Sequence, residues 1–449
     1  MSATMRKLTY TFLAALFAIA AWGQNYGNST GYHRSSLFVM PVVHMQDSFS
    51  NEILYSAQNL PFPDRYNNLN ETGVVQVVQV DDRSNHRSVK DTTKHRMYDK
   101  ALNESELAKM IVAHWFMFDT LRGFTTERLV TEGMYDASEL QKELASGTLS
   151  GMINLVDAGN ELVSKSFVLV NDMSYINHAD RAQTVSDICT VIADWGKEAQ
   201  KVGNELQQSN TGIGLLDGVL GLAGAASSLA GSVVELAGDL TKSTNELLEI
   251  KGFAVLEATY LYQLDWSPAV QNTFYTRYYT ENGDQSRIEA FLNDRSTFRL
   301  KYVGMMPTVT NNATAFNAGE YSKMQQADQI LITCARTMDD AINNLQAKFE
   351  DFRVYTPIMQ ILYDAKGKVT GFVAAIGQKE GVTLKKKYAV REMVFQHGKT
   401  TYRDFMPPLK ADQIWDNRHG VEQDMNAVRG TTFKTKNGKL YPGLLLIEK

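Results

Sequence analysis

The sequence changes its pattern near Asp351, and this change restricts the fold more than any other feature. From there to the end, short β-type runs are separated by recurring turn signals, at residues 364–367, 379–381, 397–399 and 437–438. Asn437 and Gly438 predict a two-residue hairpin, because a type I′ turn needs positive φ at both central residues. Residues 351–449 therefore predict a small antiparallel β-barrel or sandwich module.

Residues 24–350 mix helical and strand patterns without a regular β-α-β alternation. Apolar residues alternate over 253–266 and predict a strand with one buried face. Residues 36–44 also predict a strand, in which Pro41 removes a hydrogen-bond donor and so indicates an edge or a bulge. Apolar spacings of three and four predict a long helix over 321–349. The predicted class is α+β, a mixed sheet with many helices that precedes the β-module.

One polar stretch of this body is expected to lie outside the regular elements. Residues 81–100 are mostly charged or polar, and only Val89, Met97 and Tyr98 are suited to burial. We therefore expect an exposed connection here.

The N-terminus has the three parts of an export signal. Arg6 and Lys7 precede an apolar run over residues 8–21, and small residues then precede Gln24, as signal peptidase cleavage requires. The run is shorter than the roughly 20 residues that a membrane-spanning helix needs. We therefore expect residues 1–23 to be a signal peptide, and the mature chain to act in the periplasm or at the periphery of the outer membrane.

Charge is unevenly distributed along the chain. Residues 351–449 hold 17 Lys and Arg against 10 Asp and Glu, whereas the whole chain holds 45 against 50, a net charge of −5. This asymmetry indicates either an anionic partner for the module or contact between the two parts, while the overall charge argues against a nucleic-acid partner. The candidate anion contact is Lys385, Lys386 and Lys387, although lysines also protect edge strands from pairing with other chains.

Residues 211–240 form a Gly- and Ala-rich apolar segment. Asp217 is the only charge between residues 212 and 234, and glycines recur at spacings of four and seven. Such spacing lines one helix face with small groups and predicts a face for self-association or membrane insertion, with a buried helical hairpin or a flexible Gly/Ala/Ser segment as the alternatives. The glycines are Gly214, Gly218, Gly224, Gly231 and Gly238.

An aromatic cluster follows the predicted strand at 253–266. Exposed rings can stack on sugars while an arginine holds an anion, but the same residues are also typical of core packing between a strand and a helix. The cluster consists of Trp266, Phe274, Tyr275, Arg277, Tyr278 and Tyr279.

Asp172, His178 and Asp180 are the nearest approach to an acid–base or metal-ligand cluster. Histidine titrates near neutral pH and carboxylates can orient it, but an ordinary turn before a helix has the same composition. The sequence contains no nucleophile elbow, phosphate-binding loop or zinc-ligand spacing. We therefore assign no catalytic residue, metal or cofactor and expect a protein that is not an enzyme. The alternative is a hydrolase whose site is assembled from distant residues.

The two cysteines fall on apolar helix faces. Cys189 and Cys334 each lie among apolar residues at spacings of three and four, so that burial is expected for both thiols. An oxidising compartment would also permit a disulfide between them. An apolar setting disfavours a catalytic thiol.

Five short segments of the chain are distinctive: RSSLF at 34–38, LPFPDRYN at 60–67, SFVLVND at 166–172, YLYQLDW at 260–266 and IWDNR at 414–418. Together they resemble an uncharacterised family of exported proteins from anaerobic Gram-negative gut and oral bacteria. The resemblance implies a cell-envelope location, but the family has no assigned activity or site residues. Residues 371–382 are also similar to a β-hairpin module of cell-envelope assembly proteins.

The sequence therefore predicts an exported, non-enzymatic cell-envelope protein for interaction or assembly, with an envelope protein or an anionic glycan as its partner. One alternative is a membrane-inserting or pore-associated component that uses residues 212–234, and self-association into an oligomer also stays open.

Overall fold

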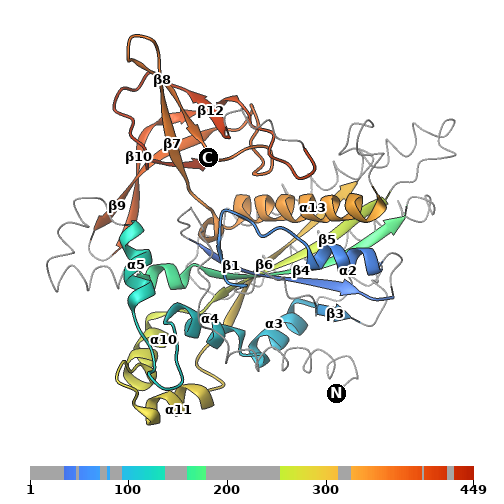
Figure 1. The fold of residues 1–449 in the computed structure, drawn as a ribbon, viewed down its shortest axis with the longest axis vertical. Helices are drawn as coiled ribbons and strands as arrows, with labels where there is room; N and C mark the ends of the chain where they lie inside the picture. Colours follow the sequence, from blue (N-terminus) through green and yellow to red (C-terminus); the bar gives the residue numbers. More distant parts are fainter. Residues whose placement is uncertain are drawn as a thin grey trace, which may run out of the picture.

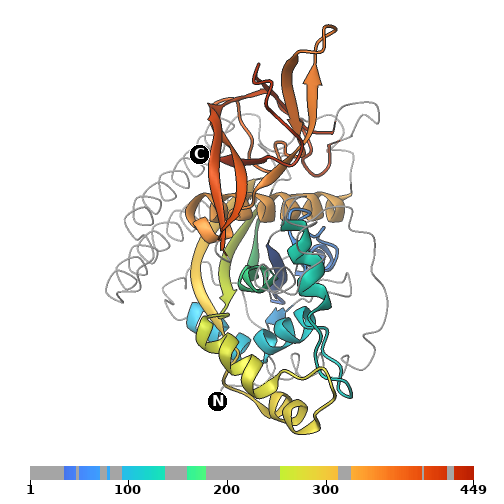
Figure 2. The same ribbon diagram turned by 90° about the vertical axis from the view of Figure 1, so that its left-hand side faces the viewer.

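The computed structural model describes residues 35–46, 50–70, 78–80, 94–136, 159–177, 253–311, 325–396, 399–421 and 429–449. They form an N-terminal body with a mixed sheet and a C-terminal module with an antiparallel sheet (Figure 1). The predicted α+β class is therefore confirmed. Helix α13 (Gln326–Lys348) lies between the body sheet and the module in both views (Figures 1 and 2).

The body sheet has the strand order β2-β1-β4-β5-β6, and β3 also pairs with β1. β1 is parallel to β2, β3 and β4, whereas β5 is antiparallel to both of its neighbours, β4 and β6. The strands are β1 (Ser36–His44), β2 (Asn67–Asn68), β3 (Val78–Val80), β4 (Ser166–Asn177), β5 (Phe253–Leu264) and β6 (Leu300–Asn311).

Each face of this sheet is covered by helices because successive strand residues point to opposite sides. Val168 and Val170 of β4 belong to a core with α3 and α4, while Phe167 and Leu169 belong to a core with α2 and α13. The covering elements are α2 (Ser50–Gln58), α3 (Lys94–Glu104), α4 (Leu107–Trp115), α5 (Glu127–Asp136), α10 (Pro268–Thr273), a π-helical turn (Phe274–Tyr278) and α11 (Gln285–Asn293).

Pro41 lies where one side of β1 has no neighbouring strand among the described residues, so the edge position that the sequence indicates is present locally, although β1 itself is an interior strand. β1 pairs with β4 along nearly its whole length, and on its other side it pairs with β2 at its start and with β3 at its end. Pro41 falls between those two short pairings. Within the described structure no neighbouring strand is present there, so the N–H that proline lacks is not needed for a ladder hydrogen bond. There the Asn70 side chain takes the place of a strand, since its amide bonds both the N–H and the carbonyl of Val39 at 2.8 and 2.9 Å.

The expectation of an exposed connection over residues 81–100 is wrong for its last part. Helix α3 begins at Lys94, and Tyr98 and Leu102 bury one face of it against the sheet. Two buried side chains four residues apart are enough to hold an otherwise polar helix in place, because burial of each contributes roughly 1.5–3 kcal/mol.

The module sheet has the order β10-β9-β13-β7-β8-β12-β11, and all of its strands are antiparallel. It is not closed into a barrel. A short 3₁₀ turn (Glu350–Phe352) leads from α13 into it. The strands are β7 (Thr356–Tyr363), β8 (Val369–Ala374), β9 (Tyr388–Gln396), β10 (Lys399–Leu409), β11 (Ala411–Gln413), β12 (Thr431–Lys434) and β13 (Leu445–Glu448).

Of the four predicted turns, those at 364–367 and 397–399 fall between paired strands, whereas those at 379–381 and 437–438 do not. The turn with Gly367, whose φ is +72°, joins β7 to β8, and residues 397–398 separate the paired strands β9 and β10. The hairpin predicted at Asn437–Gly438 is wrong, because β12 and β13 pair with other strands. Gly438 has no positive φ, and the Asn437 side chain instead accepts the Lys439 N–H at 3.0 Å in a local turn.

Candidate functional site

The aromatic cluster lies largely within the hydrophobic core. Trp266, Phe274 and Tyr278 are buried, so they do not form the exposed stacking surface considered from the sequence. Phe116 contacts both Trp266 and Phe274, and Tyr278 packs on Phe291 and Phe298. Tyr275 and Tyr279 are partly buried against the same core, and the Arg277 guanidinium lies over the Tyr278 ring at 5.4 Å.

Several predicted site residues lie outside the described residues: His178, Asp180, Cys189, the export signal and the segment 211–240 with its five glycines. Cys334 is described, and its thiol is buried and free, with a pKa that burial raises. Among the described helices, none combines the length and the apolar character that crossing a bilayer requires.

Asp172 belongs to a buried polar cluster that the sequence did not reveal. Its Oδ1 lies 2.6 Å from His44 Nε2, and its Oδ2 lies 3.0 Å from both Lys94 Nζ and Tyr98 Oη. β4 provides Asp172, the end of β1 provides His44, and the first turns of α3 provide Lys94 and Tyr98. The three partners lie 128, 78 and 74 residues from Asp172 in the sequence, and only the fold brings them together.

The neighbouring charges explain how Asp172 stays ionised although it is buried. Burial alone would raise the pKa of Asp172, but the nearby Lys94 and His44 reverse this effect and hold that pKa well below its usual range. Burial and the Asp172 charge together raise the pKa of Tyr98. Both carboxylate oxygens are occupied by donors, which suits a residue that fixes β1, β4 and α3 relative to one another.

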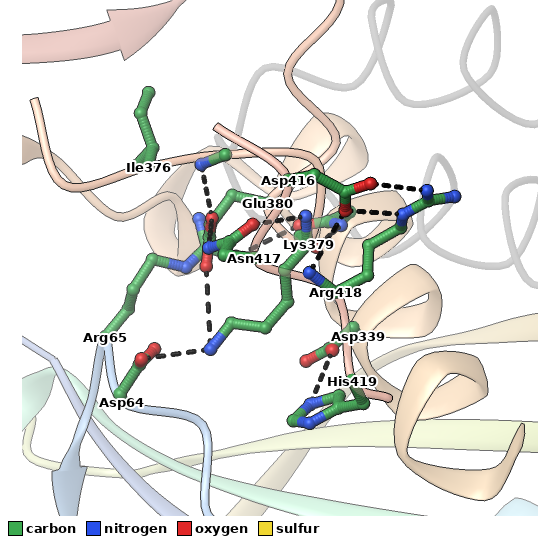
Figure 3. Close-up of polar contacts among 12 residues, drawn as sticks. Asp64, Arg65, Asp339, Ile376, Lys379, Glu380, Asp416, Asn417, Arg418 and His419 are labelled. Carbon is green, nitrogen blue, oxygen red and sulfur yellow. Dashed lines mark hydrogen bonds and ion pairs between the residues drawn. The ribbon is translucent and has the colours of Figure 1, made fainter. Parts of the chain in front are cut away.

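A second polar cluster joins the body to the module on the outer face of α13 (Figure 3). The inner face of this helix packs on the sheet through Cys334, Met338 and Ile342. Its outer face carries Arg336, Asp339 and Asn343, which contact two loops of the module, residues 376–381 and 415–420. We call these contacts and the two loops the junction.

The first junction loop is held together by the buried Glu380 carboxylate. Its Oε2 accepts the Gly377 N–H at 2.6 Å and the Asn417 side-chain amide at 2.8 Å. Lys379 then anchors the loop to the body, because its Nζ lies 2.9 Å from Asp64 and its carbonyl accepts the Asn343 amide at 2.7 Å.

The second junction loop meets α13 through charged groups. The Arg336 guanidinium donates from Nε to the His419 carbonyl at 2.9 Å, and His419 Nε2 lies 2.9 Å from Asp339 Oδ2. Burial raises the pKa of Asp339 despite the nearby His419. Part of the basic charge of the module thus faces acidic groups of the body, which is the intramolecular alternative that the charge asymmetry allowed.

Replacing Glu380 by alanine is expected to lower the free energy of unfolding by about 2–4 kcal/mol, because two donors lose their charged acceptor. Tryptophan fluorescence during denaturant titration measures this change, and Trp415 lies in the junction, since its carbonyl accepts the Gln378 N–H at 2.9 Å. Asp412→Ala removes only a surface pair with Lys434 and should cost less than about 1 kcal/mol. Equal effects of the two substitutions would contradict the role given to Glu380.

Lys385, Lys386 and Lys387 lie directly before β9. Lys386 pairs with Glu448 at 2.9 Å, while Lys385 and Lys387 are exposed. β9 lies between β10 and β13, so these lysines do not protect an edge strand. The described residues include no group of three or more His, Cys, Asp or Glu side chains placed to hold a metal ion.

Comparison with protein-family models, with curated proteins and with solved structures finds no match for this chain.

Proposed function

We propose that this chain is an exported, non-enzymatic protein of the cell envelope that recognises or assembles with a partner through its C-terminal module. The observation that carries this proposal is the junction, in which partly buried charged groups pair Lys379 with Asp64 and His419 with Asp339 and so orient the module on the body. Desolvating such groups is costly unless each finds its partner, so a polar junction of this kind defines orientation more sharply than apolar contact does. A module held in this way is suited to presenting a surface.

The contacts within the Asp172 cluster support a structural role, and not a catalytic one, for Asp172 and His44. A general base needs a free lone pair within reach of the substrate. Both oxygens of Asp172 are already bound by buried donors, and its lowered pKa makes it a weak base. The signal at the N-terminus and the family resemblance support the envelope location.

The module also presents apolar side chains to solvent. Met359 and Tyr363 on β7 are 54% and 61% exposed, and the hairpin of β7 and β8 projects away from the body in Figure 1. Exposed aromatic and methionine side chains are enriched where proteins bind partners. This hairpin is therefore the first place to look for a partner.

Site-specific photo-crosslinking in the producing cell tests the proposal. A photoreactive residue at Met359 or Tyr363 is expected to trap an envelope component, whereas the same residue at Tyr55 or Leu121 on the body is not. Tyr55 and Leu121 are 48% and 75% exposed, so accessibility is matched. The same samples give the mature N-terminus by mass spectrometry, which is expected at Gln24.

Two results would contradict the proposal. Crosslinks from the body positions that are as abundant as those from the module would remove the assigned role of the module. An intact Met1 on protein from the cell interior would remove the envelope location.

A further inference from the structure

Two lysines of the module face each other across a pair of strand ends. Lys387 directly precedes β9, Lys449 directly follows β13, and the Lys449 N–H donates to the Lys387 carbonyl at 2.9 Å. Both side chains are exposed. Like charges placed directly opposite on neighbouring strands destabilise a sheet, so this arrangement works against the fold locally. Such local conflicts are expected at functional sites.

Neither of the usual structural explanations accounts for these charges. β9 and β13 are both interior strands, so lysines at their ends do not block an open edge. In the part of the chain that the structure describes, Lys385 and Lys387 form no ion pair, whereas Lys386 is neutralised by Glu448. Lys385 and Lys387 therefore leave positive charge exposed to solvent at this place.

An apolar side chain completes the surface. Leu384 is 58% exposed and directly precedes the lysines. We call the surface formed by Leu384, Lys385, Lys387 and Lys449 the basic corner. A soluble anionic glycan would engage its charges but would give Leu384 nothing apolar to contact. A bilayer offers both, with phosphates at the headgroups and an apolar layer beneath them.

We propose that the basic corner docks the module on an anionic lipid surface, with the lysines at the headgroup phosphates and Leu384 at the boundary of the acyl chains. Three lysines and one leucine give weak, reversible binding, because each lysine near an anionic surface strengthens partition only about fivefold. The inference deepens the proposed function by naming the class of surface that the module contacts. It rests on that function only for the envelope location.

Vesicle binding tests the inference directly. The protein is purified in the form that the cell accumulates and is sedimented with phosphatidylcholine vesicles, with or without about one third phosphatidylglycerol. We expect binding to the anionic vesicles only, weakened by added salt. The variant Lys385→Gln/Lys387→Gln should lower the partition coefficient about 25-fold, and Leu384→Ser should lower it about fivefold.

The control pair Lys436→Gln/Lys439→Gln removes the same charge from exposed positions between β12 and β13, and we expect less than about a twofold change from it. An equal effect of the control would show attraction by net charge alone and overturn the inference. The inference would also be overturned if the Leu384→Ser variant bound vesicles at the wild-type level and soluble polygalacturonate competed for binding. That combination identifies a glycan site. The assay does not depend on export or on crosslinking, so its failure is distinguishable from failure of the proposed function.

Discussion

Asp172→Asn is expected to lower the free energy of unfolding by about 3–5 kcal/mol, because it leaves Lys94 and His44 without the carboxylate that compensates them. The group it removes is buried, with both oxygens bound. Since the pKa of Asp172 is lowered in the folded state, its stabilising effect is present above the unfolded pKa of about 3.9 and is lost as the pH falls below that value. The difference between variant and wild type should therefore shrink under acidic conditions.

Denaturant titration of both proteins at neutral pH and near pH 3 measures this difference. Asp351→Asn is the control, because Asp351 is exposed and forms only a surface pair with Lys165 at 3.2 Å. It should change the free energy of unfolding by less than about 1 kcal/mol. If Asp172→Asn is as stable as this control at neutral pH, the Asp172 cluster does not hold β1, β4 and α3 together.

The Asp172 cluster also shows where prediction from the sequence stops. An aspartate that ends a continuous apolar run is a visible signal, and it directed attention to Asp172. Its predicted neighbours were His178 and Asp180, because sequence reasoning can only group residues that are close along the chain. Its observed partners come from β1 and from α3, which was expected to be an exposed connection.

The elements themselves were predictable where one periodicity dominated. Strand β5 and helix α13 were anticipated from alternation and from spacings of three and four, since each buries one continuous face. Helix α3 was not, because Tyr98 and Leu102 are too few to outweigh its charged residues until the sheet is present. The turn at Asn437 was misassigned because an asparagine side chain can close a turn without positive φ.

In the sequence, only the difference in charge between the two parts of the chain indicated the junction. Residues such as Lys379, Glu380 and His419 have the composition of solvated loops, and nothing local indicates burial. Glu380 is buried, and Lys379 and His419 are half-buried, because α13 presents polar groups on the face opposite its apolar one. Helix α13 can thus pack on the body sheet with its apolar side and contact the module with its polar side.

Glu257→Gln is expected to stabilise the protein by an amount that grows with pH. Glu257 lies on β5 beneath α13, and burial raises its pKa to about 8, with Asp340 and Asp339 adding to the effect. Thr259 donates to one carboxyl oxygen at 2.8 Å, and within the described structure Oε2 has no hydrogen-bond partner. The folded state therefore retains a proton that the unfolded chain releases above its ordinary pKa of about 4.3.

A raised folded pKa makes the contribution of Glu257 to stability complete below the unfolded pKa, and that contribution is lost as the pH rises toward 8. Glutamine resembles the protonated acid in shape and keeps an acceptor for Thr259, but it releases no proton. The variant should exceed wild type by about 1 kcal/mol near pH 5 and by about 4 kcal/mol near pH 8 in free energy of unfolding. Glu350→Gln, at an exposed position next to α13, should show no such trend. A constant difference across this range would mean that Glu257 is ionised in the folded protein, and that α13 covers a charge and not a neutral acid.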